Sequence, residues 1–313
     1  MSKERIVVTG AAGFIGSNLC RALLREGYQV VGVDNLTAGL KENLPPEVEF
    51  HAIDIREPGL ERVLKGATAI FHLAAKNTLL DCIKDPLATV DNNVKGTVML
   101  LEAMRRASID RLLYADTSAE YEGISVFPTP EANVSPLGVY AASKRAAWLF
   151  CNSYVSLHGL KLTTLRYFNV YGPAQDWRRS LPPVMSAFAI RLMRGEQPII
   201  YGTGEKARDF IHVDDVNRFH LLALRDPRSI DRIFNLGSGV ATSVNEVYAL
   251  VEGILRTGLK PVYRPDNPGE AFKTQADIGA ARSMGWAPEL ALNSGVRQFL
   301  DYIRPKVESQ AVR

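Results

Sequence analysis

Tyr140 and Lys144 are the two residues whose types and spacing most directly suggest chemistry. They open and close the run YAASK at residues 140–144, so on a helix they share one face. An ammonium group beside a phenol favours the tyrosinate form, which lowers the pKa of the tyrosine toward the range of a general base. Residues four apart are common on any helix, so the pair gains a catalytic interpretation only from the motifs around it.

A glycine-rich stretch at residues 9–16, TGAAGFIG, supplies that context. It lies between an apolar run at 5–8 and a helical pattern at 17–25, which predicts a strand, a tight turn and a helix. Glycines in such a turn let the backbone approach a pyrophosphate, and the helix N-terminus offers free N–H donors. Asp34 ends a second apolar run, at 28–33, where a carboxylate can bind an adenosine ribose. These residues predict a dinucleotide site; the alternative is a tight turn without a ligand.

A third polar segment, DTSAEYEG at residues 116–123, follows the apolar run 111–115. It is expected at the carboxyl end of a strand, where a hydroxyl can share a hydrogen bond with the tyrosine and a substrate. The alternative is an ordinary polar turn. Ser135 followed by Pro136 has the pattern of a helix start, so the helix that carries Tyr140 is expected to begin there.

The first half of the chain alternates apolar, strand-like runs with helical patterns, which positions these motifs. Continuous apolar strands separated by helices predict a buried parallel sheet, doubly wound, whose ligand sits at the carboxyl ends of the strands. The expected strands are 6–8, 29–33, 48–53, 69–73, 111–115 and 162–167, and the two longest helices are 86–107 and 139–156.

After about residue 169 the sequence pattern changes to short expected elements separated by glycine and proline. We therefore expect an α/β architecture with a dinucleotide-binding domain at 1–168 and a smaller α/β lobe, mainly for substrate, at 169–313. Residues 213–233 are expected to pack back onto the first domain.

Composition excludes several classes of function. The formal net charge of the 313 residues is only +3, from 37 basic and 34 acidic residues, and the basic residues are scattered, so a nucleic-acid partner is not expected. Cys20, Cys82 and Cys151 are far apart, which predicts buried free thiols rather than disulfides or a metal site. No apolar run is long enough to span a membrane, and no secretion signal is evident, so a cytoplasmic protein is expected.

Taken together, the three motifs resemble the extended short-chain dehydrogenase/reductase family, and within it the NAD-dependent nucleotide-sugar epimerases and dehydratases. The chain looks most like the UDP-glucose and UDP-N-acetylglucosamine 4-epimerases. The resemblance runs over essentially the whole chain, and it implies a Rossmann domain with a smaller C-terminal lobe. Further matching stretches are HLAA at 72–75, NNVKGT at 92–97, RYFNVYGP at 166–173 and RDFIHVDD at 208–215.

The resemblance implies an NAD site, because the charge of Asp34 would repel the extra phosphate of NADP. No metal is implied. The implied cofactor-binding residues are Gly10, Gly13, Phe14, Ile15 and Gly16 at the pyrophosphate, Asp34, Asn35, Asp54 and Ile55 at the adenosine, and Leu73, Ala74, Ala75, Lys76, Asn93, Tyr140, Lys144 and Tyr167 on the nicotinamide side.

The same resemblance implies a catalytic base, Tyr140, an orienting partner, Lys144, and a catalytic hydroxyl on Ser118. It also implies a UDP-sugar substrate, with arginine suited to the diphosphate. The implied substrate-binding residues are Ser118, Asn169, Val184, Tyr201, Arg208 and Thr274.

The first step shared by these enzymes is removal of the sugar 4-hydroxyl proton while hydride leaves C4 for NAD, which gives a 4-keto sugar. Epimerases return the hydride to the other face, whereas 4,6-dehydratases eliminate water with a Thr-Asp-Glu set. The matching residues here are Ser118, Ala119 and Glu120. Since alanine cannot protonate a leaving hydroxyl, we favour a 4-epimerase; the alternative is a 4,6- or 5,6-dehydratase or a decarboxylase that uses Glu120 as its base.

Two departures concern the substrate. Where relatives carry a diphosphate-binding arginine this chain has Asn267, and Arg264 is a candidate replacement. Thr274 stands at the position that gates the sugar C2 substituent; because threonine is small, UDP-GlcNAc or UDP-GalNAc is expected alongside or above UDP-glucose or UDP-galactose.

The resemblance also implies a homodimer in which helices 86–107 and 139–156 pair with those of the partner in a four-helix contact. The other readings are a non-catalytic NAD-binding protein, which typically lacks the Tyr/Lys pair, and a dehydrogenase that releases its reduced cofactor at each turnover.

Overall fold

The central element is a sheet of seven parallel strands in the order β10-β6-β5-β4-β1-β2-β3. The computed structural model describes residues 3–179, 182–266 and 271–311, with side chains to residue 309. The strands are β1 (Arg5–Thr9), β2 (Gln29–Val33), β3 (Glu49–His51), β4 (Ala69–His72), β5 (Arg111–Thr117), β6 (Lys161–Tyr167) and β10 (Arg232–Leu236). The strand order reverses between β1 and β4, the switch point at which such sheets bind ligands. This confirms the expected doubly wound α/β fold.

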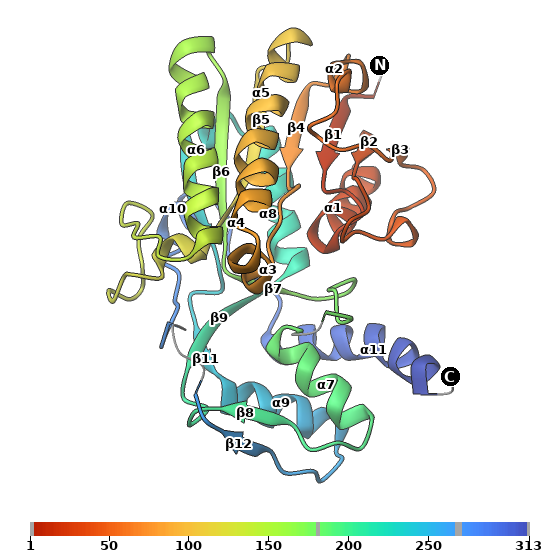
Figure 1. Ribbon diagram of the computed structural model, residues 1–313, viewed down its shortest axis with the longest axis vertical. Helices are drawn as coiled ribbons and strands as arrows, with labels where there is room; N and C mark the ends of the chain where they lie inside the picture. Colours follow the sequence, from red (N-terminus) through yellow and green to blue (C-terminus); the bar gives the residue numbers. More distant parts are fainter. Residues whose placement is uncertain (1–2, 180–181, 267–270, 312–313) are drawn as a thin grey trace.

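Helices cover both faces of this sheet, as Figure 1 shows. Helices α1 (Phe14–Arg25), α8 (Val213–Arg225) and α10 (Gly279–Ser283) pack on one face, and α2 (Leu60–Leu64), α5 (Gly96–Arg106) and α6 (Val139–His158) pack on the other. Single-turn 3₁₀ helices lie at Lys41–Asn43, Ser118–Tyr121 and Pro227–Ser229.

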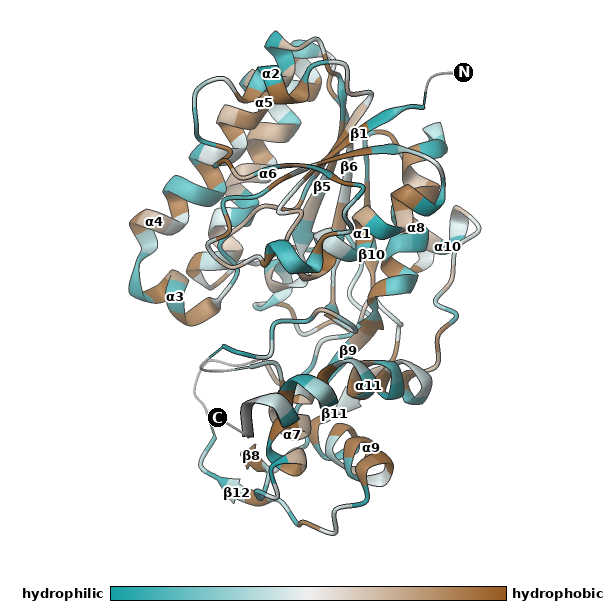
Figure 2. Cartoon of the chain, turned by 90° about the vertical axis from the view of Figure 1, so that its right-hand side faces the viewer, coloured by the Kyte–Doolittle hydropathy of each residue, from teal (hydrophilic) through white to brown (hydrophobic). Residues whose placement is uncertain are grey.

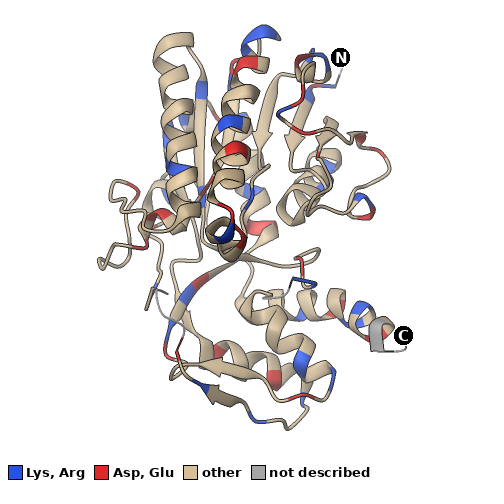
Figure 3. Cartoon of the chain, in the orientation of Figure 1, with Lys and Arg blue, Asp and Glu red and all other residues tan. Residues whose placement is uncertain are grey.

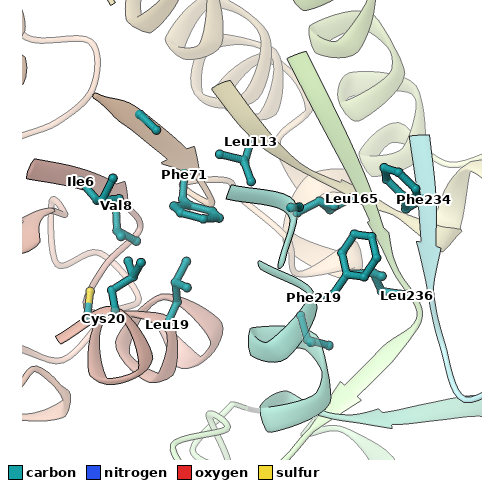
Figure 4. Packing of buried hydrophobic residues seen from close by; sticks show 14 of the residues in the cluster. Ile6, Val8, Leu19, Cys20, Phe71, Leu113, Leu165, Phe219, Phe234 and Leu236 are labelled. Atoms are coloured by element: carbon teal, nitrogen blue, oxygen red, sulfur yellow. The ribbon is translucent and has the colours of Figure 1, made fainter. Parts of the chain in front are cut away.

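The alternation of strand side chains explains this two-sided core. Ile6 and Val8 point to the face of α1 and α8, whereas Val7 between them points to the face of α5 and α6. In Figure 4, Leu19 and Cys20 of α1 and Phe219 of α8 meet the apolar side chains of the strands on the first face.

Two helix expectations need correction. Helix α6 begins at Val139, after the N-cap Gly138, which agrees with the expected range 139–156 but not with a helix start at Ser135. The backbone of Ser135 is instead bonded to the strand-end turn: its N–H donates to the Glu120 carbonyl at 2.7 Å, and its carbonyl accepts from Gly123 at 3.0 Å. The expected helix at 86–107 is three consecutive pieces, α4 (Pro86–Val90), a π-helical turn (Asp91–Lys95) and α5.

The strand predictions differ from the structure in three main ways. Strand β3 ends at His51, two residues before its expected end at residue 53. Strand β5 continues to Thr117, two residues past its expected end. The seventh strand, β10, was not among the expected strands; it follows α8 and pairs with β6 at the edge of the sheet. The boundary between domains at residues 168 and 169 stays a prediction.

The smaller lobe lies beyond the carboxyl edge of the sheet (Figure 1). Helices α7 (Val184–Met193), α9 (Val244–Leu255) and α11 (Leu292–Ala311) enclose an apolar core, to which Phe188, Val251 and Phe299 belong. A sheet of β11 (Ala241–Ser243), β9 (Ala207–His212) and β7 (Asn169–Tyr171) and a parallel pair of β8 (Ile199–Tyr201) and β12 (Val262–Arg264) complete it.

Three features of the described residues concern nucleic acids, membranes and metal ions. Figure 3 shows lysine and arginine scattered over both lobes. None of the helices in the described ranges combines the length and apolar character needed to cross a membrane. Among the same residues, no group of three or more His, Cys, Asp or Glu side chains is placed to hold a metal ion.

Candidate active site

Two adjoining cavities lie between the sheet and the smaller lobe. The first, of about 420 Å³, is bordered by the glycine-rich turn and the carboxyl ends of β2, β4, β5 and β6. The second, of about 990 Å³, is bordered by α7, β8 and β9. The cavities share Asn169, Val170, Gln175, Arg179 and Pro183, so they form one continuous cleft.

The glycine-rich turn forms a cradle that no side chain could occupy. Gly10 has a φ of +68°, in the left-handed region that favours glycine. A Cβ on Gly16 would lie 2.1 Å from the Gly10 carbonyl oxygen. Helix α1 is capped by Gly13 without a side-chain hydrogen bond, which leaves first-turn N–H groups for an anion. The turn residues Gly10, Gly13, Phe14, Ile15 and Gly16 all line the first cavity.

Asp34 lies at the end of β2, beside this turn. Its carboxylate accepts hydrogen bonds from the backbone N–H groups of Ala12, at 3.0 Å, and Leu36, at 2.8 Å. Burial raises its pKa. Asn35 donates to Asp54 at 2.7 Å, and both line the cavity with Ile55, so the expected adenosine-side residues come together. The cradle with its carboxylate fits NAD, whose pyrophosphate would lie against the α1 N-terminus and whose ribose would lie at Asp34.

The nicotinamide side is only partly as expected. Leu73, Ala74, Ala75 and Tyr167 line the first cavity, but Lys76 and Asn93 do not. Asn93 is buried and binds the backbone of Lys76 twice, accepting from its N–H at 2.7 Å and donating to its carbonyl at 3.0 Å. Asn93 therefore holds the loop after β4, whereas its neighbour Asn92, in the π-helical turn, lines the cavity.

Tyr140 and Lys144 both line the first cavity, on the first turns of α6. The Lys144 Nζ lies 4.1 Å from the ring centroid of Tyr114, and burial lowers the pKa of Lys144 to about 8. The lowering of the Tyr140 pKa by the ammonium of Lys144, which the sequence motif predicts, stays a prediction. Burial raises the pKa of Tyr140, and the charge of Asp116 adds to the rise, while a hydrogen bond with Thr117 and the charge of Arg179 oppose it.

Thr117 and Arg179 are two site residues that the sequence analysis missed. Both line the first cavity, and Arg179 also lines the second. Thr117 was placed in a turn, although β5 extends to it and so directs it toward Tyr140. Ser118, the expected catalytic hydroxyl, lines the same cavity. Arg179 comes from an irregular segment after β7 and contacts Asp176, so no periodic pattern could reveal it.

Glu120 is not placed to act on a substrate. Its side chain is fully buried, lines neither cavity, and lies 3.0 Å from Arg166 Nη2 and 3.7 Å from Arg145 Nη1. Burial, together with the charge of Asp116, raises its pKa to about 7. Its surroundings are those of an internal ion pair, so the alternative in which Glu120 serves as a C5 base is not favoured.

The smaller lobe contributes most of the second cavity. Asn169, Val184, Tyr201 and Arg208 line it, as expected of substrate-binding residues, and so do Arg191, Arg194 and Lys206, which the sequence analysis had not singled out. Thr274 lines neither cavity; its hydroxyl accepts a hydrogen bond from the Asp209 N–H at 3.4 Å, next to Arg208. Arg264 lies on β12, paired with Tyr201, and lines neither cavity, while Asn267 lies outside the described residues.

Comparison with known proteins agrees with this geometry. Residues 6–237 match the NAD dependent epimerase/dehydratase family. A putative UDP-glucose 4-epimerase of Methanocaldococcus jannaschii is 34% identical over 96% of this chain and 98% of its own. The structure of a Thermotoga maritima UDP-glucose 4-epimerase with UDP-glucose has a TM-score of 0.93 and 35% identity over 97% of this chain and 99% of that one.

A Thermus thermophilus UDP-glucose 4-epimerase in complex with NAD has a TM-score of 0.88 and 32% identity, over 96% of this chain and 99% of that one. The family match and the glycine cradle with Asp34 agree on NAD as the cofactor, and the resemblance seen in the sequence motifs is confirmed. The chain belongs to the NAD-dependent epimerase/dehydratase family.

Proposed function

We propose that this protein is a 4-epimerase of a UDP-sugar that works through a transient 4-keto intermediate. The substrates that fit the proposal are UDP-GlcNAc with UDP-GalNAc, UDP-glucose with UDP-galactose, or both pairs. Support comes from two relatives of similar length, one named a putative UDP-glucose 4-epimerase, at 34% identity, and one named a UDP-glucose 4-epimerase, at 35%.

The observation that carries the choice of reaction is the placement of Glu120. Elimination or decarboxylation after the keto step needs an acid or base near C5, and the family position for that base is Glu120. This carboxylate is fully buried against Arg166 and lines neither cavity, and the neighbouring acid position holds Ala119. A 4-epimerase needs neither group, because the keto sugar only has to rotate in the site and accept hydride on its other face.

The residues of the chain divide the work of this reaction. NAD, when bound, accepts hydride from C4 and returns it. Tyr140 takes the proton of the 4-hydroxyl and later gives it back, while Thr117 and Ser118 offer hydroxyls beside the same oxygen. Lys144 supports the tyrosinate and the ribose of the cofactor. In this scheme, the second cavity receives the UDP moiety, whose diphosphate suits basic side chains such as Arg208.

We also propose a homodimer formed through α4 and α6. Large apolar side chains on these helices are exposed: Leu87 by 82%, Val90 by 50% and Leu149 by 50%, with Phe150 and Leu157 beside them. Figure 2 shows hydrophobic residues on α3 (Leu79–Lys84) and α4 at the edge of the molecule. Exposed apolar patches of this kind are typical of protein contacts. The free buried thiols Cys20, Cys82 and Cys151 support a reducing, cytoplasmic location.

The experiment is to incubate the purified protein separately with UDP-GlcNAc and UDP-glucose, and to determine the mass and the C4 configuration of the product. Unchanged mass with inverted C4 supports the proposal. Loss of water indicates a dehydratase, accumulation of NADH indicates a dehydrogenase, and bound NAD without turnover indicates a non-catalytic protein. Tyr140→Phe is expected to lower kcat by roughly 10²–10⁴-fold, the usual contribution of a general base.

A further inference from the structure

Four charged side chains from β5, β6, α6 and the turn after β5 form a buried group. They are Arg166 and Glu120, each 0% exposed, and Asp116 and Lys144, each 3% exposed. When all four are ionised, their formal charges sum to zero. A buried charge is costly unless an opposite charge compensates it, so the ionisation of each member depends on the others.

Arg166 holds the two carboxylates of this group in place. Its Nε donates to Asp116 Oδ2 at 2.8 Å, and its Nη2 lies 3.0 Å from Glu120 Oε2. Its Nη1 donates to the Tyr121 hydroxyl at 2.9 Å and to the Glu131 carbonyl at 2.7 Å. With contacts at all three nitrogens, the guanidinium fixes the position of Asp116 at the end of β5.

Asp116 and Lys144 both line the first cavity. Only one Asp116 oxygen is taken by Arg166; the other, Oδ1, is buried and has no hydrogen-bond partner in the part of the chain that the structure describes. Burial lowers the pKa of Lys144, and the charge of Asp116 opposes this effect more strongly than that of Glu120.

The other titratable groups around Lys144 carry no compensating charge near neutral pH. Burial raises the pKa of Cys151 to about 12 and lowers that of His72 to about 3, so the thiol and the imidazole are neutral. Burial likewise raises the pKa values of Tyr114 and Tyr140, so both phenols are neutral. Burial and the charge of Asp116 raise the pKa of Glu120, so Glu120 compensates Lys144 less than Asp116 does.

We propose that Asp116, fixed by Arg166, is a positioning residue that keeps Lys144 in its ammonium form, with Glu120 as a weaker second contributor. The catalytic consequence rests on the proposed function, in which the ammonium of Lys144 supports the tyrosinate of Tyr140. Asp116 acts through Lys144 and transfers no proton itself. The electrostatic part of the proposal concerns the protein alone and can be tested without a substrate.

The direct test is NMR titration of the whole protein, isotopically labelled at the lysine Nζ atoms, with the Lys144 signal assigned from a Lys144→Met variant. Wild-type Lys144 is expected to titrate near pH 8. In Asp116→Asn the midpoint should fall by roughly one to three pH units, the range for loss of a close opposite charge. The matched neutralisation Glu120→Gln should lower it by less. Equal midpoints in wild type and Asp116→Asn would overturn the proposal.

Thermal melting shows whether each variant folds. If Asp116→Asn does not fold, Glu120→Gln decides alone, because a Lys144 midpoint that stays unchanged in that variant contradicts a charge-balanced group. In the turnover assay, the alkaline limb of the kcat profile should move to lower pH in Asp116→Asn. A kcat lowered equally at every pH would indicate a purely structural role. A wild-type protein that turns over no UDP-sugar would overturn the proposed function, while the NMR titration would still test the charge group.

Discussion

Gly16 lies so close to Gly10 that a Cβ on Gly16 would be only 2.1 Å from the Gly10 carbonyl oxygen. The contact is between two backbones, so no side chain can move to relieve it. Gly16→Ala is therefore expected to displace the turn from the α1 N-terminus and to weaken NAD binding by roughly 100-fold, or about 2.8 kcal/mol. Isothermal titration with NAD measures this loss.

The matched control is Gly253→Ala. Gly253 lies inside helix α9, and a Cβ there would meet nothing within 4 Å. Alanine is more favourable than glycine inside a helix. This variant should therefore bind NAD normally, and its free energy of unfolding should be about 0.5–1 kcal/mol higher than that of the wild type. Wild-type NAD affinity in Gly16→Ala would show that the turn does not hold the pyrophosphate.

Arg179 should determine the pH at which kcat falls on the acid side of its pH profile, which is the acid limb. Its positive charge opposes the rise in the pKa of Tyr140 that burial causes. In Arg179→Gln this opposition is lost, so the pKa of Tyr140 rises further and less tyrosinate is present at a given pH. The acid limb of kcat is therefore expected to move to higher pH.

Arg178→Gln is the control for this prediction. Arg178 also pairs with Asp176, at 3.1 Å, but it lines only the second cavity. The Arg178→Gln variant should change KM, while the acid limb of its kcat profile should stay at the wild-type pH. The interpretation of Arg179 would be wrong if both variants moved the limb equally.

The proposed dimer predicts a change of assembly without unfolding. The double variant with Leu87→Glu and Phe150→Glu places charges on the exposed apolar faces of α4 and α6. It should sediment as a monomer with native circular dichroism. Val240→Glu, at a site 62% exposed in the smaller lobe, should remain dimeric. A wild-type protein that sediments as a monomer contradicts the proposal.

Thr274→Tyr tests the choice of sugar. The larger side chain, next to Arg208 on β9, should lower kcat/KM for UDP-GlcNAc by roughly 10–200-fold, the range for steric discrimination of small groups. Activity on UDP-glucose should stay within about twofold of the wild type. Thr274→Val, which loses only the hydroxyl that accepts from the Asp209 N–H, should retain both activities. Equal losses on both sugars in Thr274→Tyr would exclude a gating role.

Local pattern was enough to predict the strands from Arg5 to Tyr167 and the strand, turn and helix around Gly10, because apolar runs and glycines act over short distances. It missed β10, an edge strand whose role depends on pairing with β6, in which partner residues such as Arg232 and Thr163 are 69 positions apart in sequence. Local pattern also did not predict the burial of Glu120, because that burial depends on contact with Arg166, which is distant in sequence.

The site residues divide in the same way. Asp34 follows its strand and is found by sequence position alone. Asn93 and Asn92 are neighbours on one π-helical turn, and only the three-dimensional structure shows that the second faces the cavity. Arg179 reaches both cavities from an irregular segment, for which local sequence offers no periodic signal.

The most direct test of a transient 4-keto intermediate is to follow the hydrogen at C4. A UDP-sugar that carries deuterium at C4 should give a product of unchanged mass with inverted configuration, and with the deuterium still at C4. Retention is expected because the hydride leaves and returns within one active site. Deuterium at C6 with loss of water, or deuterium in released NADH, would contradict the account.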